Sequence, residues 1–287
     1  MAFVALPNYL HYQALSTLMQ LNVVSFVVKP AVIKLDELHE LIALEKAGSG
    51  RVYIDFHKLF DPINLEIRRL VTGTSLISFS SQMTQRIDML DIYKDTLIAD
   101  PTFNINHYLG CHYIHLLSSF VNASPRTVQS TATLGTANEH LMLSGILDTI
   151  TTKIAWEYPN SETFVSTHLA GWIDDSSSPS MTHQSYDLEA PGLKIKSDQG
   201  FRGLEIFSEG RRITPNPDFF RVPDPGEGIL GWRANYGFRS IEYFLTCFST
   251  EDSEASWAPT LEDSIIVTRI LEAADRSLNN DSEVIHI

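Results

Sequence analysis

The sequence predicts an α/β segment followed by an α+β segment: a small parallel sheet, then a large, open, mostly antiparallel sheet covered by helices on one face. In the first segment, short apolar runs alternate with helical patterns, which is the rhythm of a doubly wound sheet. Beyond Gly73 the strands are long and alternate apolar with polar residues, as in an antiparallel sheet with one buried face. We therefore expect two domains, over residues 1–73 and 74–287.

Apolar runs and turn residues define the elements of the first segment. Buried strands are expected at 1–6, 22–28 and 52–56, and helices at 9–20, 35–47 and 62–71. Pro7-Asn8 ends the first strand, Lys29-Pro30 ends the second, and Gly48 ends the second helix. Strand and helix thus alternate throughout this segment.

Longer elements are expected in the second segment. Its strands should lie at 76–83, 127–133, 149–157, 163–172, in a pair around 194–206 and at 284–287. Its helices should lie at 106–120, 238–248 and 261–278. Thr260 is the expected N-cap of the last helix, with Asp263 three residues on. The helix at 106–120 should cover the sheet, and 215–231, rich in proline and glycine, should be a loop.

The stretch 103–117, FNINHYLGCHYIHLL, holds three histidines and two tyrosines in one apolar window. Asn104 or Asn106 is a suitable N-cap for a helix here. The residues at helical spacing, which should share one buried face, are Ile105, Leu109, His112 and Leu116. Two interpretations of His112 stay open: a core histidine with satisfied hydrogen bonds, or a proton-transfer group at a pocket wall.

Composition narrows the function classes. The formal net charge of -14 argues against nucleic acid and anionic membrane surfaces as partners. No apolar run is long enough for a membrane span, and the first residues lack the basic region of a secretory signal. Cys111 and Cys247 provide neither a metal-binding spacing nor a disulfide framework. We expect a cytoplasmic protein without a metal site.

Several motifs occur in a fixed order along the chain. They are Pro7-Asn8-Tyr9-Leu10-His11, Val27-Val28-Lys29-Pro30, Phe56-His57-Lys58-Leu59-Phe60-Asp61-Pro62, Tyr108-Leu109 ahead of His112, Tyr236-Gly237 ahead of Arg239-Ser240-Ile241-Glu242, and the ending TLEDSIIVTRILEAADRSL. Together they resemble the glucose–fructose oxidoreductase and inositol dehydrogenase family, Gfo/Idh/MocA, over essentially the whole chain.

The resemblance implies a Rossmann nucleotide-binding domain, an open-sheet domain, and redox chemistry on a sugar-like molecule with a nicotinamide cofactor. It implies that Lys29 and His112 flank the reacting carbon and move the proton, with Tyr108 beside them. Oxidation of a secondary alcohol requires such a group, because the hydroxyl proton must be removed. The resemblance places Pro7, Asn8, His11 and Pro30 on the cofactor side. It also implies a homodimer or higher oligomer paired through the large sheet, and the apolar edge at 3–6 would add a second contact.

The sequence departs from the family pattern at several places. Val28 stands where the family has a glutamate before the lysine, and Tyr108 where it has an aspartate before the histidine. The G-x-G-x-x-G turn and the ribose-binding acid are absent. No cofactor is therefore expected for this chain, with NAD(P) only if an intact nucleotide half exists. Three explanations stay open: a shortened, redox-silent descendant, a sequence recorded without its true N-terminus, or a partner that covers the sheet edge.

Further polar residues are candidates for substrate binding. His57, Lys58 and Asp61 follow a strand end, the usual place of ligand contacts in open α/β sheets, and the alternative is a solvated turn. Trp156 and Trp172 are expected to pack in the core. The other candidates for substrate binding are His183, Gln184, Arg202, Tyr236 and Arg239.

Three functions are compatible with these observations. The first is an oxidoreductase-family enzyme whose Lys29 and His112 transfer a proton at a hydroxyl or carbonyl of a small molecule, sugar-like or a secondary metabolite. The second is redox-silent chemistry in the same pocket, such as elimination, isomerisation or cyclisation. The third is a non-catalytic, ligand-sensing regulatory protein. Loss of turnover with retained binding after replacement of Lys29 and His112 would distinguish an enzyme from a sensor.

Overall fold

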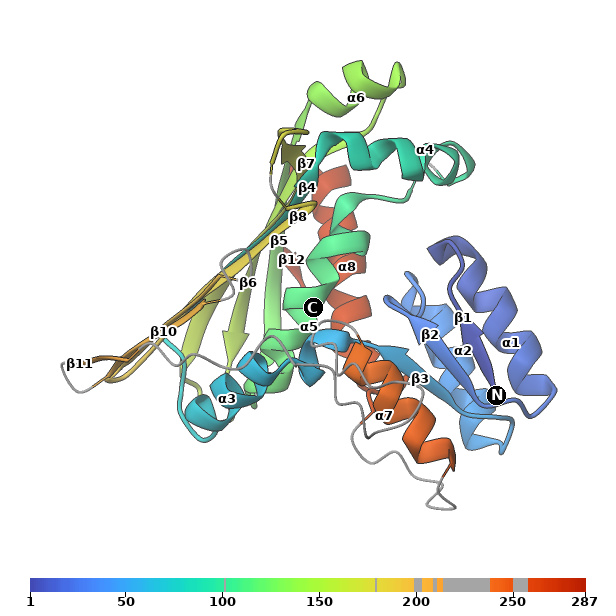
Figure 1. The fold of residues 1–287 in the computed structure, drawn as a ribbon, viewed down its shortest axis with the longest axis horizontal. Helices are drawn as coiled ribbons and strands as arrows, with labels where there is room; N and C mark the ends of the chain where they lie inside the picture. The colour runs from blue at the N-terminus through green and yellow to red at the C-terminus, as the bar shows by residue number, and fades with distance from the viewer. Residues whose placement is uncertain (101, 179, 199–202, 209–210, 214–237, 250–257) are drawn as a thin grey trace, which may run out of the picture.

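The computed structural model describes residues 1–100, 102–178, 180–198, 203–208, 211–213, 238–249 and 258–287. A small sheet and a large sheet stand side by side, with helices between them (Figure 1). The chain starts in the small sheet, and its last residues return to the large one. The expected order, α/β followed by α+β, is confirmed.

The small sheet is fully parallel, with the strand order β1-β2-β3. Its strands are β1 (Ala2–Val4), β2 (Ser25–Val28) and β3 (Val52–Asp55), connected by α1 (His11–Gln20) and α2 (Leu35–Lys46). The outer side of β3 receives one antiparallel bridge, in which the N–H of Ile54 donates to the carbonyl of Pro259 at 2.8 Å. Because the strands are parallel, the segments that follow β2 and β3 emerge at the same edge of the sheet.

The large sheet has the strand order β11-β10-β9-β8-β4-β7-β6-β5-β12. Its strands are β4 (Ser78–Arg86), β5 (Ser124–Leu134), β6 (Leu147–Glu157), β7 (Thr163–Asp174), β8 (Thr182–Ala190), β9 (Leu193–Asp198), β10 (Gly203–Ser208), β11 (Arg211–Ile213) and β12 (Ile285–His286). β4 and β7 pair parallel, and the other pairs of described neighbours are antiparallel. The expected mostly antiparallel sheet is therefore confirmed.

One face of the large sheet is covered by α5 (Cys111–Phe120) and α8 (Ser264–Asn279), which lie between the two sheets (Figure 1). A π-helical turn, η4 (Asn106–Gly110), leads into α5. Alternate residues of β6 and β7, including both tryptophans, are buried on this side. The other helical elements are η1 (Asn8–Leu10), η2 (His57–Phe60), α3 (Pro62–Val71), η3 (Ile87–Met89), α4 (Leu90–Ala99), α6 (Thr136–Leu141) and α7 (Phe238–Ser249).

Four helices and strands of the structure are absent from the expected set: α4, α6, β8 and β11. α4 buries only Leu90 and exposes Ile92 and Ile98, so it shows no apolar stripe of helical period. α6 is six residues long, and the Asp148 carboxylate of β6 accepts the N–H groups at its start, that of Ala137 at 2.7 Å. The contact between Asp148 and the start of α6 joins residues of two elements, so it is not visible in a local sequence pattern.

The start of α8 differs from the expected one. The helix begins at Ser264, and Thr260 is not its N-cap. Instead, the Asp263 carboxylate accepts hydrogen bonds from the N–H and the hydroxyl of Thr260, both at 2.8 Å. The bond from the Thr260 N–H is the half of the expected capping box that the structure forms, whereas the Thr260 hydroxyl donates to the carboxylate instead of accepting the N–H of Asp263. Within the described part, no helix combines the length and apolar character needed to cross a bilayer.

Candidate active site

Basic and aromatic side chains meet where the segments after β2 and β3 reach η4 and α5. Lys29 follows β2 and forms a cis peptide bond with Pro30. Its Nζ donates a hydrogen bond to the main-chain carbonyl of Tyr108, and it lies 4.4 Å from the centroid of the Tyr108 ring. The ammonium of Lys29 is thus held at η4, one turn before His112.

Two histidines lie edge to face beside this lysine. The ring centroids of His57 and His112 are 4.7 Å apart at an interplanar angle of 66°, and His112 is buried. Burial lowers the pKa of His112 well below its usual value, and the charges of Lys29 and Lys58 act in the same direction. Burial likewise lowers the pKa of His57. Both rings are therefore neutral near pH 7, and within the described part the buried Nδ1 of His112 has no hydrogen-bond partner.

Lys58, the next residue after His57, is an amine inside the protein. Its Nζ donates to Gln184 Oε1 at 2.6 Å and lies 4.6 Å from the centroid of the Tyr113 ring. Burial lowers the pKa of Lys58 to about 7, against the opposing effect of the Asp61 carboxylate. A lysine that loses its proton near neutral pH can act as either a proton donor or an acceptor.

Asp55 supplies an acidic neighbour for Lys29, which Val28 cannot provide. It pairs with Val28 in the parallel register of β2 and β3, which puts its carboxylate in the field of Lys29. Burial raises the pKa of Asp55, while a hydrogen bond from Ser240 and the charge of Lys29 lower it. Val28 therefore leaves Lys29 without an acidic neighbour along the chain, whereas in the folded protein the adjacent strand supplies one.

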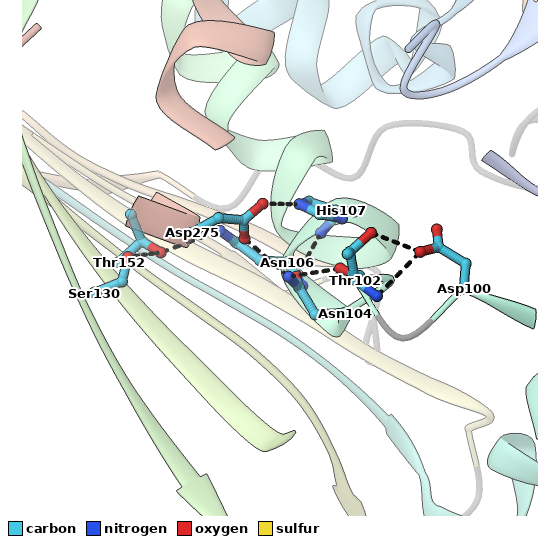
Figure 2. Close-up of polar contacts among 8 residues, drawn as sticks. All are labelled: Asp100, Thr102, Asn104, Asn106, His107, Ser130, Thr152 and Asp275. Atoms are coloured by element: carbon cyan, nitrogen blue, oxygen red, sulfur yellow. Dashed lines mark hydrogen bonds and ion pairs between the residues drawn. The ribbon is translucent and has the colours of Figure 1, made fainter. Parts of the chain in front are cut away.

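A polar network from α8 and the sheet holds the turn that leads into α5 (Figure 2). Asn104 Oδ1 accepts the N–H of Asn106 at 3.0 Å and that of His107 at 3.3 Å, which is the capping role expected of Asn104 or Asn106. Asp275 on α8 accepts from Asn104 Nδ2 at 2.9 Å and from His107 Nε2 at 2.8 Å. Asn106 Nδ2 donates to Thr152 Oγ1 at 3.3 Å. The position of η4 is therefore set by two distant segments.

Gly110 is required by the same turn. A Cβ atom at this position would lie 1.9 Å from Asn106 Oδ1, closer than any side chain tolerates. A glycine in the middle of a helix is otherwise unfavourable, so its presence here reflects the close approach of the Asn106 side chain. π-helical turns of this kind are frequent at functional sites.

Tyr108 forms part of an aromatic group rather than a pair with His112. Its hydroxyl accepts a hydrogen bond from Tyr93 on α4, and its ring stacks on Trp172 with centroids 5.8 Å apart. No hydrogen bond joins its side chain to His112 within the described part, so the tyrosine–histidine bond that the helical spacing allows is not formed. Trp172 is buried, and Trp156 donates from Nε1 to Ser166 at 2.8 Å, so both tryptophans pack in the core as expected.

The structure brings together Lys29, His57, Lys58, Tyr108, His112 and Gln184, with the Asp61 carboxylate acting on Lys58. Asp61 accepts the N–H of Ile63 at 3.0 Å and caps α3. His183 contacts Ser185 at 3.2 Å on β8, and Arg239 lies at the start of α7. Arg202 and Tyr236 lie outside the described residues. Within the described part, no group of histidine, cysteine or acidic side chains could hold a metal ion.

The residues assigned to the cofactor side form the turn after β1 and the peptide after β2. The ring nitrogens of His11 face the carbonyls of Pro30 at 2.9 Å and Leu6 at 2.8 Å. Pro7 precedes η1 and, as a proline, has no N–H, and Asn8 begins η1. A pyrophosphate requires several main-chain N–H groups pointing outward at a glycine-rich helix start. The described residues of this turn do not fit that requirement, although their assignment to the cofactor side stays a prediction.

Comparison with known proteins finds similar structures but no similar sequences. No family model matches the sequence, and no curated protein does. Solved structures match closely in shape. An inositol dehydrogenase homolog from Azotobacter vinelandii, complexed with NADH and myo-inositol, superposes with a TM-score of 0.77 at 12% identity, over 100% of this chain and 78% of that one. An aldose-aldose oxidoreductase from Caulobacter crescentus, complexed with glycerol, has a TM-score of 0.75 at 12% identity, over 99% of this chain and 78% of that one.

A third structure agrees with these two. UDP-N-acetylglucosamine 3-dehydrogenase GnnA from Acidithiobacillus ferrooxidans has a TM-score of 0.73 at 14% identity, over 98% of this chain and 80% of that one. The fold is that of the Gfo/Idh/MocA oxidoreductases. The resemblance noted in the sequence therefore predicts the correct fold. At these identities the comparison describes the Gfo/Idh/MocA architecture alone, so the chemistry must be argued from the site.

Proposed function

We propose that this chain is an enzyme that moves a proton at a hydroxyl- or carbonyl-bearing carbon of a small molecule, using Lys29 and His112. The observation that carries the proposal is the buried Nδ1 of His112, which has no hydrogen-bond partner among the described residues and lies beside the ammonium of Lys29. Buried polar atoms in a folded protein are normally paired, so an open one at a strand-end cluster is a candidate for contact with a substrate.

The two residues have complementary roles in this proposal. A neutral His112 can accept a proton, because burial lowers its pKa and leaves a ring nitrogen with a free lone pair. Lys29, held by the Tyr108 carbonyl, can stabilise the negative charge that develops on a substrate oxygen. Lys58, whose pKa is about 7, adds a second group that can exchange a proton near neutral pH. Tyr93, Tyr108 and Trp172 would provide an aromatic wall.

The proposed substrate is a polyol, sugar or similarly oxygenated metabolite. The structures of similar shape support this class, because one is a complex with myo-inositol, one is an aldose-aldose oxidoreductase and one is a dehydrogenase of a nucleotide sugar. The chemistry that we favour is redox-silent: elimination, or isomerisation through an enol. It is favoured because proton transfer at a carbon next to a carbonyl needs only groups that the described residues supply, namely Lys29 and His112.

Hydrogen exchange provides the test. A carbonyl substrate that loses its α-proton to His112 exchanges that proton in D₂O, which proton NMR detects without net turnover. We would screen keto-inositols and keto-sugars with the purified protein. His112→Ala should lower the exchange rate by about two to four orders of magnitude. Lys29→Met should abolish exchange, and Lys29→Arg should not restore it, because the larger guanidinium does not fit the position of the amine.

A histidine outside the cluster serves as control. His140, on α6, contacts Asp91 at 3.1 Å, and His140→Ala should leave the exchange rate unchanged. If Lys29→Met and His112→Ala both keep the native rate on a true substrate, the chemistry lies elsewhere. If the protein binds its ligand without exchange or turnover, the ligand-sensing alternative is the better description.

A further inference from the structure

A second cavity lies behind the segment that carries His57 and Lys58, on the side of α3 and the start of α8. Its volume is about 410 Å³, at the lower end of the range of small-molecule sites. The residues that line it are Leu59, Arg68, His115, Ser118, Ser119, Ala258, Pro259, Glu262, Asp263 and Ile266. Four of these are apolar, and the remainder offer charges or hydrogen bonds.

His115 is the unusual member of this lining. Its side chain is 4% exposed and stacks on Phe56, with ring centroids 3.6 Å apart. Burial lowers the pKa of His115 to about 3, so the ring is neutral and offers one N–H donor and one lone pair. Among the described residues, no side chain or carbonyl forms a hydrogen bond with this ring. A polar group that is nine-tenths buried normally has a partner, and here the adjacent open space is the cavity.

Charges of both signs face the same cavity: Glu262 pairs with Lys46 at 2.8 Å, whereas no ion pair joins Arg68 to Asp263 among the described residues. The guanidinium of Arg68 forms no ion pair with any described residue, and Asp263 uses only Oδ2, for Thr260. Ser118 and Ser119 donate to carbonyls of their own helix at 2.7 and 2.6 Å, so toward the cavity their hydroxyls can only accept. The lining thus presents a cationic donor on one wall and anionic or neutral acceptors on the others.

We propose that this cavity is a second ligand site, and that it binds an α-amino acid with an apolar side chain. The carboxylate would pair with Arg68, the ammonium with Asp263 and the serine hydroxyls, and the side chain would pack on Leu59 and Ile266, with His115 completing the hydrogen bonds. An anion alone would meet Glu262 and Asp263, and a cation alone would meet Arg68. A zwitterion satisfies both walls.

The position of the cavity connects it to the candidate active site. His115 and His112 lie one turn apart on α5 and contact Phe56 and His57, which are consecutive in the chain. Leu59, in the same 3₁₀ turn as Lys58, lines the cavity. A ligand bound here would therefore touch the segment that positions both His57 and Lys58. This placement suits an effector rather than a substrate.

Calorimetry on the full chain tests the proposal without any assay of turnover, so its outcome is independent of the proton-transfer function. The probes are L-leucine and L-valine, with 4-methylpentanoate and 3-methylbutylamine as analogues of leucine that lack one of the two charges. At least one amino acid should bind with a millimolar or lower Kd, and both analogues should bind at least about tenfold more weakly. Absence of binding by both amino acids, or equal binding of an analogue, would overturn the proposal.

Neighbouring arginines provide a matched pair of variants. Arg68→Gln should weaken amino-acid binding at least about tenfold. Arg69→Gln should not, because Arg69 pairs with Glu66 at 2.7 Å and does not line the cavity. His115→Gln tests the buried ring, and since it can also disturb packing on Phe56, its stability is measured in parallel. Equal affinity of the Arg68→Gln and Arg69→Gln proteins would place binding elsewhere and refute the assignment.

Discussion

Lys58 on η2 and Gln184 on β8 meet inside the protein, with Nζ 2.6 Å from Oε1. The contact joins the turn after the small sheet to the large sheet. An amine in this position is unfavourable for stability while it is charged, because its pKa of about 7 lies far below the usual 10.5. Between these two pH values the unfolded chain binds a proton that the folded protein does not bind. The contribution of Lys58 to folding therefore becomes more favourable as the pH rises from about 7 to about 10.

Replacing this lysine by an apolar residue should remove that dependence. We expect Lys58→Met to be more stable than the native protein at pH 7, by about 1–3 kcal/mol, and to lose the rise in stability toward pH 10. Urea unfolding at pH 7 and pH 9.5 measures both quantities. Lys153→Met, on an exposed position of β6, is the control and should keep the native pH dependence. A pH dependence of Lys58→Met equal to the native one would contradict the assignment.

Buried histidines should make the protein sensitive to acid. Burial lowers the pKa of both His115 and His168 to about 3. Below pH 6.5 the unfolded chain binds protons that the folded protein excludes, so stability falls as the pH falls from about 6.5 toward 3. Each histidine should account for about 1.5 kcal/mol between pH 6.5 and 5. The ring nitrogens of His168 contact Ser81 and Ser166 at 2.8 and 2.9 Å. In urea unfolding, His168→Gln should reduce the loss of stability between pH 6.5 and 5 by about 1.5 kcal/mol. An unchanged loss would argue against a neutral His168.

Asp275 should be far more important for stability than an ordinary surface carboxylate. It accepts hydrogen bonds from Asn104 and His107, and His107 is buried. Asp275→Ala leaves the buried His107 Nε2 without its partner and Asn104 Nδ2 with only a 3.5 Å bond to the Thr102 carbonyl, so we expect a loss of about 2–3 kcal/mol in the free energy of unfolding. Asp95→Ala on the exposed side of α4 should change it by less than about 0.5 kcal/mol. Similar losses for the two variants in chemical denaturation would mean that the network in Figure 2 has little energetic weight.

The nicotinamide dinucleotides NAD(H) and NADP(H) should bind weakly or not at all to this 287-residue chain. The turn after β1 contains Pro7, which has no N–H, and no glycine-rich helix start follows it. Titration calorimetry with NAD(H) and NADP(H) should show no binding below millimolar concentration. A micromolar dissociation constant would show that another part of the chain provides the phosphate site, and redox chemistry would then become the favoured function.

We expect the large sheet to pair with a second copy of the chain. Its face away from α5 and α8 has no described helix over it and exposes apolar residues, among them Val165 at 51% and Ile173 at 44%. Light scattering coupled to gel filtration should give at least a dimer, and Val165→Arg should shift it toward the monomer. A native protein that elutes as a clean 32.2 kDa monomer at micromolar concentration would exclude this interface.

Local signals explain which elements the sequence predicts correctly. α3 spans Pro62–Val71 as expected, because Asp61 caps it and Pro62 occupies the first turn. Strand ends likewise identify the place where Lys29 and His57 meet. The contacts that complete the site are not local. Asp55 becomes a neighbour of Lys29 only through the register of two strands, and Asp275 lies 168 residues from His107 along the chain. The periodicity of a single sequence cannot predict contacts between residues that lie so far apart in the chain.

The last helix occupies the space between the two sheets, and the residues just before it bridge to the outer side of β3. During synthesis the ribosome releases the small sheet first and α8 near the end, so until α8 emerges the parts of β5, α5 and α2 that pack against it have no cover. Nascent chains of this protein should therefore depend on chaperones late in translation. A stop codon in place of Ser264, which removes α8 together with β12, should yield insoluble protein rather than a shorter folded domain.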